Sequence, residues 1–303
     1  MKNRPPLLNS CPSELLHFWT FAPLNYCTFS LLRCIAVLRM ILKMDIFKLA
    51  GDPKFIPGIY NYCDRWCERC FLTSRCMTYA IDTEDNKDPS ARDLNNKAFW
   101  ERLHAIFRQT AEMLNELASE MGVDLTPFDR ESLSESMSYK IDEADNHELI
   151  RASHQYIQMA DKWFESEYSL FEQKEDELNS LLGIGIDETK IHCEAHSIRD
   201  AVEIIRWYQH QIYVKLKRAL IQSDFINEEQ ENVIFENDSI GSAKVALIGI
   251  DRSIGAWGKL YEHFPESTDS ILDILVHINR LRRRVEQLFP QARNFKRPGF
   301  DDM

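Results

Sequence analysis

The chain has 303 residues, of which 36 are Lys or Arg and 48 are Asp or Glu, so its formal net charge is −12. This length fits one large domain or two small ones, and a hydrophobic share of 44% can bury a sizeable core, which excludes disordered and collagen-like chains. The acidic balance argues against nucleic-acid binding, which needs a basic face, and the low count of 10 Gly favours helices over glycine-rich phosphate loops.

Residues 1–43 differ in composition from everything that follows. They contain five basic residues and one acid, whereas the remainder contains 31 basic and 47 acidic residues. Within them, 15–32 lacks charged side chains and is long enough to be weighed as a membrane span or an uncleaved signal sequence. The alternatives are a packed N-terminal helix, or an atypical leader outside the native fold with translation starting at Met44 in place of Met1. The globular composition that begins at Met44 favours the leader.

Four of the eight cysteines form a compact run with the spacing C-x3-C-x2-C-x5-C. If this segment is helical, the first three project from one face and the fourth returns from the next turn. Four thiolates close the coordination shell of zinc or an iron–sulfur cluster, which favours a structural or electron-transfer role over an open catalytic metal. The predicted ligands are Cys63, Cys67, Cys70 and Cys76.

We expect a [4Fe–4S] cluster at these cysteines, with structural Zn²⁺ as the alternative and metal-free buried or redox thiols as a third interpretation. A disulfide framework is disfavoured, because such frameworks belong to short, cysteine-dense secreted chains.

Parts of this run resemble two known motifs. The C-x3-C-x2-C spacing is that of radical S-adenosylmethionine enzymes, but those usually place an aromatic residue before the third cysteine, where Arg69 stands here, and need repeated βα units. The stretch from Cys67 to Cys76 resembles the end of the iron–sulfur loop of endonuclease III and adenine glycosylases, with Phe71 in place of a proline and a shorter first gap. Counted from Cys63, the compared run covers about fourteen residues. The resemblance implies a [4Fe–4S] cluster and does not extend to glycosylase activity.

From 95 to 290, apolar residues recur at helical spacing and predict a bundle of about five helices. An acidic linker at 81–94 precedes the bundle, and a polar segment at 123–144 interrupts it. Gly249, Ser253 and Ala256 give one helix a small-residue face for close packing. The predicted helices cover 99–121, 149–181, 197–219, 241–264 and 269–288.

The predicted fold class is therefore all-α. A cysteine-rich helical metal-binding segment at 44–80 precedes the helical bundle at 95–290, and a C-terminal tail follows at 291–303.

A His and carboxylate metal centre inside the bundle is a second hypothesis. Glu101-x-x-His104 is one pair of the kind that di-iron bundles use. Each of these residues also has an ordinary structural interpretation. The histidines can be hydrogen-bonded core residues, and Glu203 can be a surface carboxylate beside an arginine such as Arg206. Asp251 can be the buried partner of an arginine. The six candidate residues are Glu101, His104, His196, Glu203, His210 and Asp251.

Three function classes follow from these patterns. The first is a cytoplasmic metal-binding helical protein with a redox or sensing role. The second is a bundle enzyme with the His and carboxylate centre, and the third is an acidic interaction module that is stapled by zinc and binds a basic protein partner. No recognisable flavin or nicotinamide motif is present, and association with a membrane depends on 15–32 being a span.

Overall fold

The computed structural model of the chain describes Leu49 and residues 51–85, 96–122, 130–184, 187–228 and 233–301. The chain divides into two compact units, 1–45 and 46–303, and the described residues all belong to the second. The leader at 1–43, the stretch 15–32 and the two candidate start sites therefore lie outside the described residues. Among the helices that are described, none is long and apolar enough to cross a membrane.

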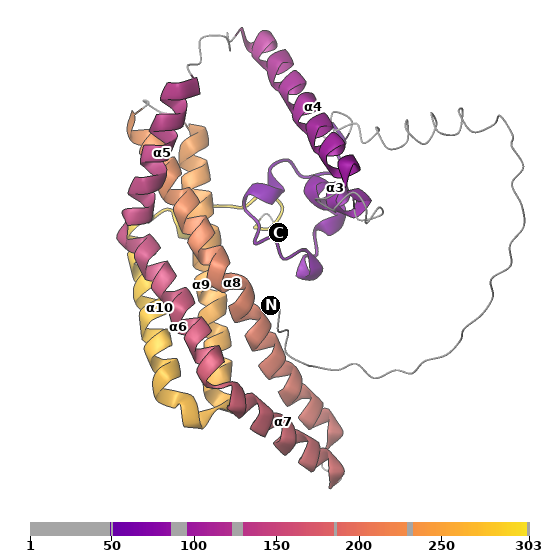
Figure 1. Ribbon diagram of the computed structural model, residues 1–303, viewed down its shortest axis with the longest axis vertical. Helices are drawn as coiled ribbons and strands as arrows, with labels where there is room; N and C mark the ends of the chain where they lie inside the picture. Colours follow the sequence, from indigo (N-terminus) through magenta and orange to yellow (C-terminus); the bar gives the residue numbers. More distant parts are fainter. Residues whose placement is uncertain are drawn as a thin grey trace, which may run out of the picture. The chain divides into compact units, whose positions relative to one another are not determined.

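The regular secondary structure of the described residues is helical and contains no strand, which confirms the predicted all-α class (Figure 1). Eight α-helices are present in this part of the chain. Their bounds are α3 (Met77–Asp85), α4 (Lys97–Met121), α5 (Arg130–Asn146), α6 (Glu148–Ser166), α7 (Tyr168–Gly183), α8 (Glu188–Glu228), α9 (Val233–His263) and α10 (Thr268–Leu288).

Four of these helices form a bundle in which each packs against two others. Helix α8 packs along α9, α9 packs on α10, α10 packs on α6, and α6 packs back on α8 (Figure 1). Helices α5 and α7 also lie against α8. The largest fully buried side chains of the bundle come from α6, α8 and α9: Tyr156, Tyr208, Trp257, Leu149, Ile150, Ile205, Ile212, Leu216, Leu247 and Ile250.

The small-residue face predicted on α9 lets it approach α8 closely. A Cβ atom on Gly249 would lie 2.9 Å from Tyr208 Cδ1 and 3.2 Å from Ile212 Cγ1. Ser253 and Ala256, at the next positions of the same face, are buried. A larger side chain at Gly249 would therefore push the two longest helices of the bundle apart.

Several helix boundaries differ from those expected. Helix α8 begins about ten residues before the predicted start at Ser197, because the Asp187 carboxylate accepts hydrogen bonds from the backbone N–H groups of Thr189 (3.0 Å) and Lys190 (3.4 Å) and caps its first turn. The single helix predicted over 149–181 is two helices, α6 and α7, which meet at Glu167.

Two segments predicted as non-helical contain helices. The segment 123–144 contains most of α5, and the expected linker at 81–94 begins with the second half of α3. Helix α5 carries little apolar periodicity, and it buries Ala144 and Lys140, so the tertiary contact with α8 determines its structure more than its own pattern does.

Candidate functional site

Residues 51–76, named here the cysteine segment, follow an irregular path with three 3₁₀ turns and no α-helix. The turns are η1 (Ile59–Asn61), η2 (Cys67–Arg69) and η3 (Thr73–Arg75). The expectation that one helix displays the cysteines is therefore wrong.

A left-handed residue explains why a helix cannot run through the cysteines. Arg65 has a φ of 59°, and it lies between Cys63 and Cys67. Instead, Cys70 closes the η2 turn by donating its N–H to the Cys67 carbonyl (3.2 Å), and Cys76 ends η3 in an extended conformation. The cysteines are thus presented by turns, which is how loop-bound metal sites are commonly built.

The four thiols are free and half-buried, and they interact electrostatically. Burial raises the pKa of the Cys67 thiol, and negative charge on Cys63, Cys76 and Cys70 raises it further. Burial likewise raises the pKa of Cys70, with added contributions from Asp64, Cys63 and Cys76. The thiols are thus neighbours in space, although no three Cys, His, Asp or Glu side chains of the described residues surround a common point as ligands of one ion.

A hydrogen-bond donor and a buried cation accompany these thiols. The backbone N–H of Leu72 donates to Cys70 Sγ at 3.4 Å, an interaction that stabilises the thiolate form. Lys215 of α8 is only 5% exposed, and its Nζ donates to the Asn61 carbonyl at 3.1 Å. Burial lowers the pKa of Lys215 to about 8, the Arg218 charge lowers it as well, and Cys63 acts in the opposite direction. A positive charge is therefore held close to Cys63.

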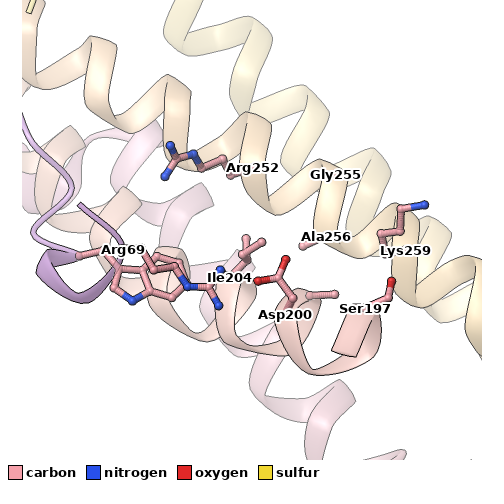
Figure 2. Close-up of a pocket in the computed structure, with 10 residues that line it drawn as sticks. Arg69, Ser197, Asp200, Ile204, Arg252, Gly255, Ala256 and Lys259 are labelled. Atoms are coloured by element: carbon pink, nitrogen blue, oxygen red, sulfur yellow. Dashed lines mark hydrogen bonds and ion pairs between the residues drawn. The ribbon is translucent and has the colours of Figure 1, made fainter. Parts of the chain in front are cut away.

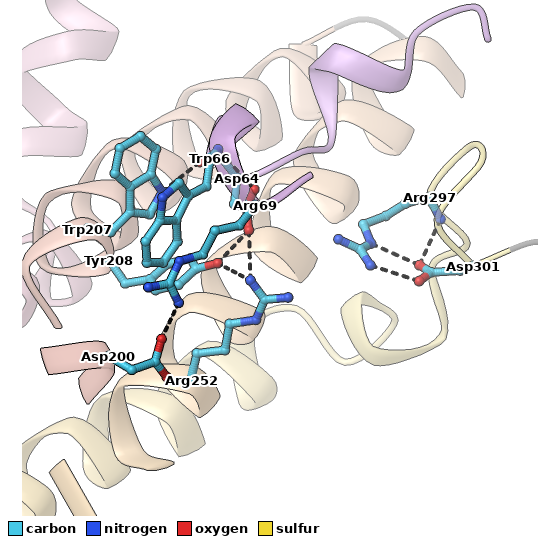
Figure 3. A network of polar contacts seen from close by, with 9 residues as sticks. All are labelled: Asp64, Trp66, Arg69, Asp200, Trp207, Tyr208, Arg252, Arg297 and Asp301. Carbon is cyan, nitrogen blue, oxygen red and sulfur yellow. Dashed lines mark hydrogen bonds and ion pairs between the residues drawn. The ribbon is translucent and has the colours of Figure 1, made fainter. Parts of the chain in front are cut away.

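Trp66 and Asp64 attach the cysteine segment to α8 and α9 (Figure 3). Trp66 stacks on Trp207, with ring centroids 5.1 Å apart, and meets Tyr208 edge-on. The Asp64 carbonyl accepts a hydrogen bond from Trp207 Nε1 at 3.0 Å, and its carboxylate accepts from Tyr208 Oη and from Arg252 Nη1 at 2.9 Å. This network fixes the stretch between the first two cysteines.

Arg69, between the second and third cysteines, makes a further attachment. Its guanidinium lies 4.0 Å from the centre of the Trp66 ring and donates to the Asp200 carboxylate and, at 2.6 Å, to Glu203 Oε2. Because these groups are partly exposed, the ion pairs orient the segment more than they stabilise it.

The residues after α10 cover another side of the cysteine segment. Phe295 meets Tyr62 edge-on with ring centroids 4.9 Å apart, and Phe300 lies against Phe71 in the same way at 6.2 Å. A Cβ atom on Gly299, whose φ is 74°, would lie 2.6 Å from Ile56 Cδ1. The predicted C-terminal tail therefore packs against the cysteines' own segment.

A pocket of ≈ 490 Å³ opens where the cysteine segment meets the bundle (Figure 2). Trp66 and Arg69 line one part of it, with Asp200 of α8 and with Arg252 and Lys259 of α9. All three cations already have carboxylate partners: Arg69 pairs with Asp200, Arg252 with Asp64, and Lys259 with Glu262. The pocket is therefore close to charge balance.

The structure does not bring the six residues of the second hypothesis together. Glu101 pairs with Lys97 (2.9 Å) on α4, and His104 is exposed on the same helix. His196, Glu203 and His210 are exposed and follow one another along α8 at seven-residue intervals, about 10 Å apart for each step along a helix axis.

Two carboxylates of that hypothesis, Asp251 and Glu203, have arginine partners, as expected if their role is structural. Asp251 accepts a hydrogen bond from Arg293 Nη2 at 3.2 Å and lies 3.6 Å from Arg282 Nη1. Glu203 pairs with Arg69, whereas Arg206 pairs with Asp161.

The sequence interpretation missed the residues that hold the cysteine segment in place. Lys215 carried a usable signal, because it falls on the apolar stripe of α8 between Ile212 and Ala219, where a lysine needs a partner. Asp64 and Arg252 carried no such sequence signal, since their contact joins parts of the chain that are 188 residues apart.

Comparison of the chain with protein-family models, with curated proteins and with solved structures gave no match.

Proposed function

We propose that this chain is a metal-binding protein whose metal stabilises the conformation of the cysteine segment. The ligands are Cys63, Cys67, Cys70 and Cys76, and the metal is a [4Fe–4S] cluster, with Zn²⁺ as the alternative. The observation that carries the proposal is the gathering of four free, half-buried, electrostatically interacting thiols in one loop-rich segment.

The poor core of the cysteine segment supports this proposal. Its 26 residues bury only Phe55, Ile59, Trp66 and Leu72 among the hydrophobic side chains. Segments of this size seldom hold their conformation through apolar burial alone, and small folds often add a structural metal. Metal binding would supply this stabilisation directly, since the ligands are brought together only in the folded segment.

The charges around the thiols also support it. Four thiolates on Zn²⁺, or on an oxidised [4Fe–4S] core, carry a net charge of about −2. Lys215 supplies a buried positive charge on the bundle side, and the Leu72 N–H supplies a hydrogen bond to Cys70 Sγ. Hydrogen bonds and nearby cations of this kind tune the stability and reduction potential of metal–thiolate sites.

The resemblance of the stretch Cys67–Cys76 to the endonuclease III loop favours the cluster over zinc, and a cluster would give the protein a redox or sensing role. The half-buried state of the thiols is compatible with electron exchange at the surface.

Metal analysis after anaerobic purification tests the proposal. We expect about four iron and four sulfide per chain with broad absorbance near 400 nm for a cluster, or about one zinc per chain for the alternative. Cys67→Ser removes the metal, whereas Cys193→Ser, an exposed cysteine on α8, leaves it bound. A protein that carries neither metal, or a Cys193→Ser variant that loses metal as fully as Cys67→Ser, would overturn the proposal.

A further inference from the structure

A serine, a histidine and a glutamate meet where α9 ends. Ser197 and Glu194 lie one turn apart on α8, and His263 is the last residue of α9. The Ser197 hydroxyl and His263 Nε2 are 3.3 Å apart, and His263 Nδ1 lies 3.6 Å from Glu194 Oε1. The His263 side chain is 18% exposed and that of Glu194 28%. The three groups therefore form a half-buried chain in the order hydroxyl, imidazole, carboxylate.

The carboxylate decides which nitrogen of His263 carries the hydrogen. Lys174 of α7 donates to Glu194 Oε1 at 2.9 Å, which holds the pKa of Glu194 below its usual range, and His263 acts in the same direction. An ionised carboxylate only accepts hydrogen bonds, so it favours the tautomer with the proton on Nδ1. Nε2 is then the acceptor for the Ser197 hydroxyl, as a general base is for its nucleophile. Such separations are often long in a free enzyme and shorten when the substrate binds.

Ser197 also lines the pocket of ≈ 490 Å³ described above, which offers space for a substrate next to the hydroxyl (Figure 2). Ala201, Ile204 and Ala256 give this pocket apolar walls on α8 and α9. A Cβ atom on Gly255, which also lines the pocket, would meet nothing within 4 Å, so the glycine leaves the wall open. A cavity of this size and lining suits a small molecule with a short apolar chain.

We propose that Ser197, His263 and Glu194 form an acyl-transfer site that hydrolyses small carboxylic esters. Ser197 Oγ bonds to the carbonyl carbon of the ester while His263 Nε2 takes the hydroxyl proton. The bond from the carbonyl carbon to the alkoxy oxygen then breaks, and the alcohol leaves with that proton. Water, activated by Nε2 in the same way, cleaves the acyl-serine, which releases the acid and restores the hydroxyl. The cysteines take no part in these steps, so the proposal stands independently of the metal.

The charges that develop in these steps have partners. The imidazolium of His263 faces Glu194 and stands at the carboxyl end of α9, where the helix dipole favours positive charge. Lys259, one turn before His263, lines the pocket, and its exposed ion pair with Glu262 can be exchanged at little cost for the oxyanion of the tetrahedral intermediate. One flexible cation stabilises an oxyanion less than fixed N–H donors do, which favours esters over amides, because an alkoxide leaves more readily.

Hydrolysis of p-nitrophenyl butyrate by the full chain tests the proposal. Ser197→Ala and His263→Gln should lower kcat/KM by at least about 100-fold. The matched controls Ser180→Ala and His196→Gln, at exposed residues of α7 and α8, should keep the wild-type value. Helical circular dichroism shows that each variant is folded. A fluorophosphonate probe should label Ser197 of the wild type, identified by peptide mass, and this readout does not depend on the stability of any variant.

Two further substitutions separate positioning from substrate binding. Glu194→Gln should lower kcat by about tenfold or more with KM unchanged, and Glu194→Asp should recover part of the loss, because the carboxylate orients the ring without touching the substrate. Gly255→Leu fills the pocket and should lower kcat/KM by about tenfold or more through KM. Gly258→Leu is the matched control, because it also has open space around it and does not line the pocket.

A wild type that hydrolyses the ester no faster than Ser197→Ala, or that takes up the probe at residues other than Ser197, would overturn the proposal. Wild-type kcat in Glu194→Gln would contradict the positioning role of Glu194. Equal KM values for Gly255→Leu and Gly258→Leu would show that the substrate does not occupy the pocket.

Discussion

The four-helix bundle buries a continuous apolar core, whereas the cysteine segment buries four large apolar side chains and changes direction at three short turns. The bundle helices contact one another along their length, so their stability comes from packing that their own sequences specify. The cysteine segment depends on contacts with α8, α9 and the residues after α10, and in our proposal on a metal.

The bundle and the cysteine segment are therefore expected to respond differently to substitutions. Loss of a core side chain weakens the bundle and everything attached to it. Loss of a ligand or a docking contact releases the cysteine segment and leaves the bundle folded, because the segment contributes few side chains to the main core.

The largest effect is expected from a cavity in the bundle. Trp257 is fully buried, meets Trp163 edge-on at 5.1 Å and donates its indole N–H to Tyr156 Oη at 3.1 Å. Trp257→Ala should lower the free energy of unfolding by about 3–5 kcal/mol, because it leaves a large void and removes one hydrogen-bond donor from the buried Tyr156 hydroxyl. Urea unfolding followed by helical circular dichroism measures this, and a loss below about 1 kcal/mol would contradict the assigned core.

A pH-dependent effect is expected from Lys215 in the metal-free protein. The pKa of Lys215 is about 8 in the folded chain, and its ordinary value is 10.5. Between pH 8 and pH 10.5, the Lys215 amine is therefore protonated in the unfolded chain and mostly deprotonated in the folded chain. The free energy of unfolding should therefore rise with pH, relative to Lys215→Met, by up to about 1.4 kcal/mol per pH unit. Urea unfolding of both proteins from pH 7.5 to 9.5 measures the difference, and parallel profiles would show that Lys215 is not buried as described.

A smaller and more local effect is expected from Gly241 on α9. A Cβ atom there would overlap the Tyr62 ring and lie 2.9 Å from Phe295 Cζ. Gly241→Ala should therefore displace the cysteine segment and the residues after α10, at about 1–3 kcal/mol. Gly258→Ala is the matched control on the same helix, because open space surrounds that position, and it should stabilise the protein slightly. Equal protease resistance of the cysteine segment in the two variants would argue against the Tyr62 contact.

The sequence predicted the helices of the bundle better than the conformation of the cysteine segment. The helix predicted over 269–288 matches α10 almost residue for residue, since its apolar stripe is regular and Pro290 follows it. The cysteine spacing also fits a helix, but Arg65 adopts a left-handed conformation, and an arginine gives no sequence signal of that conformation. The docking residues Asp64 and Arg252 could not be paired from the sequence, because a single chain does not reveal which distant polar residues meet.

Hydrogen exchange with and without bound metal distinguishes the two regions most directly. After chelation under anaerobic conditions, the amides of residues 51–76 should lose protection, while those of α8 and α9 keep it, because the bundle retains its own core. Identical exchange of residues 51–76 in the loaded and the chelated protein would contradict the claim that a metal stabilises the cysteine segment.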